Sequence, residues 1–261
     1  MNFTNTLHKM NFNELKSFLD FKADQYESLD FIEHDPIQIP HQFKQKEDIE
    51  ISGFLMATIA WGNRKSIIEN GKKLMHIMEN SPLDFIKNYK DGALLSSKFV
   101  HRTFNVEDLD FFARSLKNAY NNGGLENYFS EHPDIEGVKG RLVNFRKKFF
   151  DIEHPQRSSK HVSNPLQNSA CKRLNIYLRW MTRDAKKGVD FGIWKNVNKS
   201  ELYLPLDVHT GNISRLLGIL NRKYNDWSAL EEVMATLKKM DESDPVKYDF
   251  ALFGIGAFEK F

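Results

Sequence analysis

Apolar residues recur along most of this chain at intervals of three and four positions, which is the spacing of a helix with one buried face. One such stripe contains Ile51, Phe54, Leu55, Thr58 and Ile59. Stripes of the same period follow at residues 67–78, 109–120, 174–181, 213–220 and 230–237. No stretch alternates strictly enough to predict a sheet. The pattern therefore predicts an all-α protein of about ten helices.

Turn-forming residues separate the predicted helices, as in Ser81-Pro82 and Ser243-Asp244-Pro245. In the second of these turns, we expect Asp244 to cap the helix that follows. Two long stretches, residues 151–167 and 186–204, are polar, contain Pro or Gly and lack a helical period, so we expect loops there. Loops of this length are often functional, and Trp194 and Tyr203 in the second one are candidates to cover a binding pocket.

The size and composition are those of an ordinary globular protein. The chain has 261 residues, of which 41% are hydrophobic and 28% charged, so it can bury a substantial core. Its longest apolar stretch, residues 53–61, is too short to span a bilayer, and no secretory signal is visible. A single cysteine, Cys171, excludes an internal disulfide and an iron–sulfur cluster bound by this chain alone. We therefore expect a cytoplasmic protein with no membrane partner, metal or other cofactor.

Positive charge is concentrated in one part of the chain. The net charge is only +2, yet residues 139–187 contain 13 lysines and arginines against three acidic residues, so their local charge is +10 and that of the remainder is −8. Such an uneven distribution is typical of a protein that binds a polyanion, although charge runs also occur on solvated faces that bind nothing. If this basic belt binds nucleic acid, we expect phosphate contacts from Arg141, Arg146, Lys147, Lys148 and Lys160.

One predicted helix, residues 169–183, combines an apolar face with cations. On a helical wheel, Arg179 and Arg183 lie within about 20° of Lys172, opposite the apolar residues. The helix is therefore predicted to bury one face and to present a cationic stripe to solvent. No carboxylate stands where it would form ion pairs along the stripe, which favours a functional role over a merely solvated face.

A second candidate lies 35 residues after Lys172, in the segment Leu204-Pro205-Leu206-Asp207-Val208-His209-Thr210. Its aspartate, Asp207, stands directly before a predicted apolar helix. This is the position of a helix N-cap, which contributes about 1 kcal/mol. An ionised carboxylate at the same place can also stabilise positive charge that develops during a reaction. From the residues alone, the helix N-cap is favoured over the charge-stabilising role of Asp207.

The two segments together resemble the helix-hairpin-helix DNA glycosylase superfamily. Residues 204–210, with Arg215-Leu216-Leu217-Gly218 after them, are similar to its Pro-Val-Asp-x-His motif. Lys172 falls where bifunctional members carry a catalytic lysine, and its long spacing to Asp207 is closest to that of the archaeal 8-oxoguanine glycosylases. The resemblance implies an all-α fold of two helical lobes with a central cleft, in which Lys172 and Asp207 are catalytic.

The resemblance also implies residues that contact an extruded base and the gap it leaves. Asn63 and Arg64 correspond to a polar tip that fills the gap, although Asn63 fits a helix cap at least as well. Phe253, within Asp249-Phe250-Ala251-Leu252-Phe253-Gly254, is similar to a residue of the helix that contacts the base. A phenylalanine at helical spacing is, however, more often part of a core.

The hairpin of the superfamily corresponds to residues 166–172, where this chain lacks the usual glycines. Asn168 tolerates the left-handed conformation that a hairpin glycine adopts, and Ser169 can cap a helix whose N-terminus attracts a phosphate. We expect both to contact DNA. The remaining candidate contacts are Arg173, Arg179, Arg183 and His209.

Over most of its length the chain resembles a second family more closely, a bacterial family of domains of unknown function, DUF2400. The shared segments are SACKRLNxxLRWM and DFALFGxG, and no function accompanies them. The expected organisation is a single all-α unit of two lobes. One is a central helical lobe at about residues 48–165, and the other combines about residues 1–47 with 166–261 and carries the hairpin and the Pro-Leu-Asp motif.

We therefore expect a base-excision repair glycosylase with abasic-site (AP) lyase activity, acting through a Schiff base on an oxidised purine in damaged duplex DNA. A non-enzymatic helix-hairpin-helix protein that binds nucleic acid by shape is the alternative. A metal-dependent hydrolase is a third hypothesis, because histidine and carboxylate side chains are suitable ligands for divalent metals. Its candidate ligands, which lack helical ligand spacing, are His34, Asp35, His41, Asp207 and His209.

Overall fold

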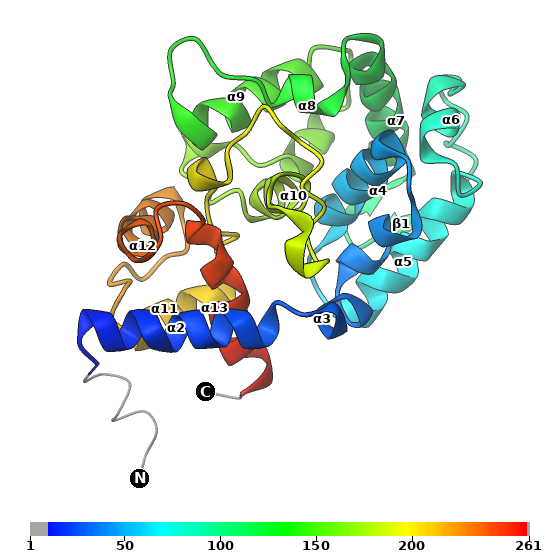
Figure 1. The fold of residues 1–261 in the computed structure, drawn as a ribbon. Coiled ribbons are helices and arrows are strands. Elements are labelled where there is room, and N and C mark those ends of the chain that lie inside the picture. Colours follow the sequence, from blue (N-terminus) through cyan, green and yellow to red (C-terminus); the bar gives the residue numbers. More distant parts are fainter. Residues whose placement is uncertain (1–9, 260–261) are drawn as a thin grey trace. The chain divides into compact units, whose positions relative to one another are not determined.

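A computed structural model of the chain describes residues 10–259 (Figure 1). Most of these residues are helical. The described part contains one pair of strands, β1 (Val100–His101) and β2 (Phe104–Asn105), which are antiparallel with His101 opposite Phe104. The predicted helical class is confirmed at this level. No helix within residues 10–259 is long and apolar enough to cross a membrane.

The chain divides into two compact units. Unit 1 contains the described chain up to Phe31, Pro165–Gly192 and the chain from Val197 onwards, whereas unit 2 contains Ile32–Asn164 and Ile193–Asn196. The first boundary lies at residue 32 instead of near residue 48. It is shifted because the 3₁₀ helices η1 (Pro36–Gln38) and η2 (Pro40–Gln42) pack against α4 (Lys46–Ile59) within unit 2.

Unit 2 is built around a cluster of phenylalanine rings. Phe54 of α4 stacks on Phe112 with their ring centroids 5.7 Å apart, and its edge meets Phe145 at 5.4 Å. Such pairs stabilise the core beyond the burial of apolar area. All residues of α4 from Ile49 to Ile59 are buried, so this helix is central rather than one-sided. The other helices of unit 2 are α5 (Arg64–Ile77), α6 (Pro82–Lys87), α7 (Val106–Asn121), α8 (Gly124–Tyr128), α9 (Gly137–Phe149) and η3 (Gln156–His161).

Unit 1 is organised around α13 (Tyr248–Phe258), which packs against α2 (Phe12–Tyr26) and α11 (Val208–Leu216) (Figure 1). Gly254 allows the contact with α2, because a Cβ atom there would lie 2.2 Å from the ring of Tyr26. Short α3 (Leu29–Glu33) crosses the boundary between the units. The other helices of unit 1 are η4 (Pro165–Gln167), α10 (Lys172–Thr182), η5 (Ala185–Lys187), η6 (Lys199–Glu201), α12 (Trp227–Met240) and η7 (Pro245–Lys247).

The two stretches predicted as loops are irregular apart from short 3₁₀ turns. Trp194, a candidate to cover a pocket, is instead 2% exposed in unit 2, where its Nε1 donates a hydrogen bond to Glu50 Oε1 at 2.6 Å. Tyr203 stacks on Trp227 of unit 1 with the ring centroids 5.4 Å apart. The burial of Trp194 corrects the expectation that this residue covers a pocket, whereas for Tyr203 it stays a prediction.

Candidate functional site

Lys172 and Asp207 meet at the start of two helices of unit 1. Lys172 is the first residue of α10, and Asp207 precedes α11 as its N-cap. Lys172 Nζ lies 3.1 Å from Asp207 Oδ2, and the two side chains are 35% and 14% exposed. The structure thus brings together an accessible amine and a more enclosed carboxylate that are far apart in the sequence.

The Asp207 carboxylate uses its two oxygens differently. Oδ1 accepts a hydrogen bond from the Thr210 N–H at 3.0 Å, and the Asp207 N–H donates to Thr210 Oγ1 at 2.7 Å, which completes a capping box. Oδ2 faces Lys172. The helix cap that the sequence favoured is therefore present, and it fixes the orientation of a carboxylate whose second oxygen remains available to the lysine.

The turn before α10 has the expected conformation at Asn168 but a different cap. Asn168 has a φ of +59°, in the left-handed region. Ser169, predicted to cap α10, instead lies two residues before the N-cap, Cys171, whose N–H donates to Ser169 Oγ at 3.2 Å. The preceding η4 is a single 3₁₀ turn. The segment therefore has a full α-helix on one side only, unlike the helix-hairpin-helix that the resemblance implied.

The start of α12 holds both elements in place. The Trp227 N–H donates to the Asn168 carbonyl at 2.9 Å, and Asn168 Nδ2 donates to Asp226 Oδ2 at 3.1 Å. Asn225 Nδ2 donates to the Asp207 carbonyl at 2.6 Å. The turn before α10, the N-cap of α11 and the start of α12 therefore converge. Asn225 and Asp226 were not predicted from the sequence, although an aspartate directly before an apolar stripe is a recognisable helix start.

The predicted cationic stripe of α10 does not face solvent, which corrects the prediction for Arg179 and Arg183. These residues are 4% and 5% exposed. Arg179 Nε donates to Asp190 Oδ1 at 3.3 Å, and the same guanidinium pairs with Asp249. Arg173, near the start of α10, is half-buried, and burial lowers the pKa of its guanidinium to about 10. The stripe is therefore largely an internal ion-pair face.

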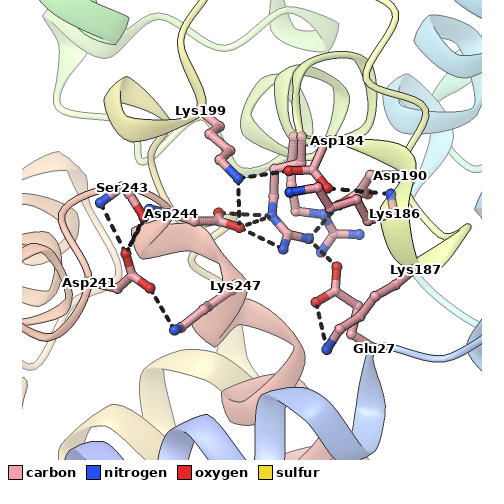
Figure 2. A network of polar contacts seen from close by, with 12 residues as sticks. Glu27, Asp184, Lys186, Lys187, Asp190, Lys199, Asp241, Ser243, Asp244 and Lys247 are labelled. Carbon is pink, nitrogen blue, oxygen red and sulfur yellow. Dashed lines mark hydrogen bonds and ion pairs between the residues drawn. The ribbon is translucent and has the colours of Figure 1, made fainter.

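Arg183 belongs to a buried network of charges, whose carboxylates Glu27, Asp190 and Asp244 are labelled in Figure 2. Its guanidinium donates to Glu27 Oε1 at 2.6 Å, Asp190 Oδ2 at 2.8 Å and Asp244 Oδ2 at 2.9 Å. Burial by itself would lower the pKa of Arg183, but the charge of Asp190 and the bonds to Asp244 and Glu27 raise it above its ordinary value. Asp244 makes no capping hydrogen bond to η7, contrary to expectation, because its carboxylate binds Arg183 instead.

A hollow of about 450 Å³ in unit 1 lies at this network, where it is lined by charged side chains from α2, η5, η6 and η7. Three of the four lining lysines form ion pairs with carboxylates, for example Lys199 at 2.7 Å from Asp184 and Lys247 at 2.6 Å from Asp241 (Figure 2). This hollow is at the C-terminal end of α10, whereas Lys172 is at the N-terminal end. It is therefore separate from the Lys172–Asp207 pair.

Asp249 is a buried carboxyl group in the first turn of α13. It belongs to the segment that resembles the base-contacting helix, but it was not among the predicted site residues. Burial raises the pKa of Asp249 to about 6; Arg179 opposes this rise, and the negative charge of Asp207 adds to it. A perturbed carboxyl group that is coupled to a lysine–aspartate pair is typical of a functional site. The sequence signal was an aspartate that opens an otherwise apolar helix.

His209 and Phe253 lie together where α11 meets α13. Their ring centroids are 5.9 Å apart and the rings are edge-on. His209 is exposed, and its Nδ1 lies 3.2 Å from the Gly256 carbonyl oxygen. Phe253 is half-buried and also meets the edge of Phe31, with the centroids 6.2 Å apart. Phe253 therefore has the packing role that its helical spacing favoured, and its contact with a base stays a prediction.

Asn63 and Arg64, the predicted wedge, lie in unit 2 at the start of α5. Asn63 is the N-cap of this helix, and its Oδ1 accepts a hydrogen bond from the Ser66 N–H at 3.2 Å. Arg64 is the first helical residue and is half-buried. The capping role of Asn63 is therefore observed, whereas the insertion of either side chain into DNA stays a prediction.

Most of the predicted basic belt in unit 2 makes internal contacts. Arg141 is 3% exposed and pairs with Glu131 at 3.1 Å. Arg146 and Lys148 donate to backbone carbonyl groups, at 3.1 Å from the Ser159 oxygen and 2.9 Å from the Asn127 oxygen. The exposed members of the belt are Lys147 and Lys160. The local charge of +10 is therefore not a continuous surface of solvent-facing cations.

The described residues offer no metal centre. Between residues 10 and 259, no group of three or more His, Cys, Asp or Glu side chains is arranged to hold a metal ion. Asp35, one of the candidate ligands, instead begins η1, where its Oδ1 accepts a hydrogen bond from the Ile37 N–H at 3.0 Å. The hypothesis of a metal-dependent hydrolase therefore has no metal site in this part of the chain.

Comparison with known proteins identifies the family. Residues 35–258 match the profile of a family described as "Protein of unknown function (DUF2400)". The chain belongs to this family. No curated protein and no solved structure matched the chain. The match spans α10, α11 and α13, so the Lys172–Asp207 pair lies inside the family region. Because the family description names no activity, function has to be argued from the chemistry of the site.

Proposed function

We propose that this protein is a DNA N-glycosylase with abasic-site lyase activity that removes an oxidised purine. The observation that carries the proposal is the 3.1 Å contact between Lys172 Nζ and Asp207 Oδ2, with the Lys172 side chain 35% exposed. A primary amine and a carboxylate are the two groups that this reaction needs, one as a nucleophile and one to stabilise positive charge on the sugar.

In the proposed first step, the Lys172 nitrogen attacks C1′ of the damaged nucleotide. The amine attacks in its neutral form, after losing its proton to the solvent that reaches it. The new N–C1′ bond replaces the bond from C1′ to the purine, whose electron pair leaves with the base and takes up a proton. The Asp207 carboxylate, whose orientation the capping box fixes, stabilises the positive charge that develops on the sugar.

In the second step, the C1′–O4′ bond breaks and O4′ takes up a proton from water. The Lys172 nitrogen, which became positively charged on attack, loses a proton to water, and the lone pair so freed forms the C=N bond of an iminium (Schiff base) with C1′. Loss of a proton from C2′ allows the C3′–O3′ bond to break, so the phosphate of the next nucleotide departs and the strand is nicked. Hydrolysis of the C=N bond releases Lys172.

Borohydride trapping tests the proposal, because it reduces the iminium to a stable amine. The wild type should become covalently linked to a duplex that carries an oxidised purine or an abasic site, and Lys172→Ala should not. Asp207→Asn is a matched variant for the carboxylate, because asparagine is an equally good N-cap but carries no charge. It should lower the rate of base release by at least about 100-fold. No adduct with any lesion or abasic site would contradict the proposal.

A non-enzymatic protein that binds nucleic acid is the second candidate. The capping box favours it, because it explains Asp207 through the stability of α11 without any reaction. This candidate predicts that DNA binding is unchanged in Asp207→Asn and that the wild type nicks no strand. Trapping of the wild type but not of Lys172→Ala would exclude it.

A further inference from the structure

The loop between α11 and α12, residues 217–226, carries side chains that the proposed chemistry does not use. Arg222, Lys223 and Tyr224 follow one another in this α11–α12 loop, and all three are exposed, with Tyr224 at 72%. Exposed aromatic rings beside cations are typical of surfaces that stack on bases and contact phosphates.

The backbone of the loop is held firmly although these side chains are exposed. Arg215, in the last turn of α11, donates hydrogen bonds to the carbonyl oxygens of Arg222 at 2.8 Å and Lys223 at 2.9 Å. It donates a third bond to Asn225 Oδ1 at 2.7 Å. A side chain on a braced backbone loses less conformational freedom on binding, so Tyr224 is presented in an orientation that suits recognition.

The loop is also joined to the candidate site. Asn225 Nδ2 donates to the Asp207 carbonyl at 2.6 Å. This approach requires the glycine at position 211, because a Cβ atom there would lie 2.5 Å from Asn225 Oδ1. At the other end of the loop, Asp226 bridges to Ser169 in the turn before α10. The loop is therefore held between the two elements that carry the Lys172–Asp207 pair.

The two cations of the loop differ in whether an ion pair with the described residues compensates their charge. Arg222 is paired with Asp226 through two hydrogen bonds, Nε to Oδ1 at 2.7 Å and a second at 2.6 Å to Oδ2. Its charge is therefore compensated within the protein. Lys223 makes no ion pair with the described residues, so its ammonium is the cation of this loop that is available to a ligand.

We propose that the α11–α12 loop contacts a DNA strand, with the Tyr224 ring stacked on an unpaired base and the Lys223 ammonium on a phosphate beside it. The inference deepens the proposed function and rests on it, because a base-excision reaction leaves unpaired bases next to the site. One aromatic ring and one available cation are too few contacts to bind an anionic membrane or to form a protein interface. Stacking on one base needs only one ring.

Fluorescence anisotropy tests the contact without any chemistry. The probes are a labelled single-stranded DNA and a duplex that carries a tetrahydrofuran abasic analogue. Tyr224→Ala should weaken binding at least about fivefold, whereas Tyr224→Phe, which keeps the ring, should bind like the wild type. Lys223→Gln should lower the slope of log Kd against log salt by about 0.7 on the single strand. The controls are Phe21→Ala, at a 64% exposed ring of α2, and Lys239→Gln, at an exposed lysine of α12.

The loop contact and the glycosylase fail in different ways. If Tyr224→Ala binds both probes like the wild type while borohydride traps the wild type, the loop contact is wrong and the glycosylase stands. If Tyr224→Ala weakens binding but no substrate gives an adduct, the loop contact stands and the glycosylase is wrong. Tighter binding of the wild type to RNA of the same sequence, or no binding to DNA, overturns the loop contact.

Discussion

The two ends of α10 carry cations on the same helical face, yet these cations have opposite surroundings. At the C-terminal end, the Arg183 side chain is 6% exposed and meets three carboxylates, those of Glu27, Asp190 and Asp244. At the N-terminal end, the Lys172 side chain is 35% exposed and meets one carboxylate, that of Asp207. A planar guanidinium can bind several carboxylates at once, whereas a compact ammonium on a flexible stem can be protonated and deprotonated readily.

The contrast separates structural charge from chemically available charge. Glu27, Asp190 and Asp244 occupy the donors of Arg183, so this end of α10 connects α2, the chain after α10 and the start of η7. Within residues 10–259, the ion pair of Lys172 joins it to the N-cap of α11, and its side chain stays 35% exposed. We therefore assign stability to the Arg183 end and chemistry to the Lys172 end, and each assignment can be tested separately.

Removing Arg183 should have the largest effect on stability. Arg183→Met removes the one cation that the carboxylates of Glu27, Asp190 and Asp244 share, and the loss of one partner from a buried charge network costs about 3–5 kcal/mol. Urea denaturation followed by circular dichroism should show this decrease in the free energy of unfolding.

Arg222→Met is the matched control for Arg183→Met. Arg222 also forms an ion pair, with Asp226 at 2.6 Å, but its side chain is 41% exposed, and solvent screens surface pairs of this kind so that they contribute little to stability. Equal losses of stability in the two variants would mean that the burial of the Arg183 network has no energetic consequence, and the contrast between the ends of α10 would disappear.

The next largest effect is expected from Asp249, which lies between the two ends through its bond to Arg179. The pKa of Asp249 is raised to about 6 by burial, and its charged neighbours are Arg179, Asp207 and Asp190. Between about pH 4 and pH 6, the folded protein therefore binds this proton more readily than the unfolded chain does. The stability that Asp249 contributes is complete below about pH 4 and is lost as the pH rises through 6.

Asp249→Asn should abolish this pH dependence, because an amide does not titrate. The unfolding free energy of the wild type relative to Asp249→Asn should fall by about 2–3 kcal/mol between pH 4 and pH 7. Denaturation at pH 4, 5.5 and 7 measures the difference. A constant difference across this range would show that Asp249 keeps an ordinary pKa in the folded protein.

The helices could be predicted from the sequence because their signal is local. The apolar spacing at residues 109–120 corresponds to α7 (Val106–Asn121), whose core-facing residues include Leu109, Phe112 and Leu116. The burial of Trp194 could not be predicted in the same way. It follows a stretch of unit 1 in the chain but is buried in unit 2, and no local period indicates which unit a loop residue joins.

In the candidate site, too, features within one helix could be predicted from the sequence, whereas contacts between distant segments could not. A helical wheel placed Lys172, Arg179 and Arg183 on one face, but it considers only partners within one helix. The carboxylates that bury Arg183 include Glu27 and Asp244, which are 156 and 61 residues away. Because ion pairs between distant segments leave no periodic signal, the predicted outward orientation of the two arginines was wrong. The motif that contains Asp207 gave a specific prediction because cap and helix are contiguous.

A smaller effect is expected at Asp207, whose structural and chemical roles can be separated. Asp207→Ala removes the capping box and should lower the unfolding free energy by about 1 kcal/mol, whereas Asp207→Asn keeps an N-cap and should change it by only a few tenths of a kcal/mol. Both variants should lose base release, because both lack the carboxylate. If Asp207→Asn releases base like the wild type, the aspartate is a cap only.

The smallest effect on stability should follow the loss of Lys172, although this variant should lose the covalent chemistry completely. Lys172→Met keeps the length of a side chain that is 35% exposed and removes its amine, and a partly exposed ion pair of this kind contributes at most about 1 kcal/mol. The removal leaves Asp207 held by its capping box, so its carboxylate keeps hydrogen bonds. Thermal and urea denaturation should therefore give values close to those of the wild type. A loss of more than 2 kcal/mol would mean that the Lys172 end supports the fold as the Arg183 end does, because removal of a partially exposed pair could then not account for the change.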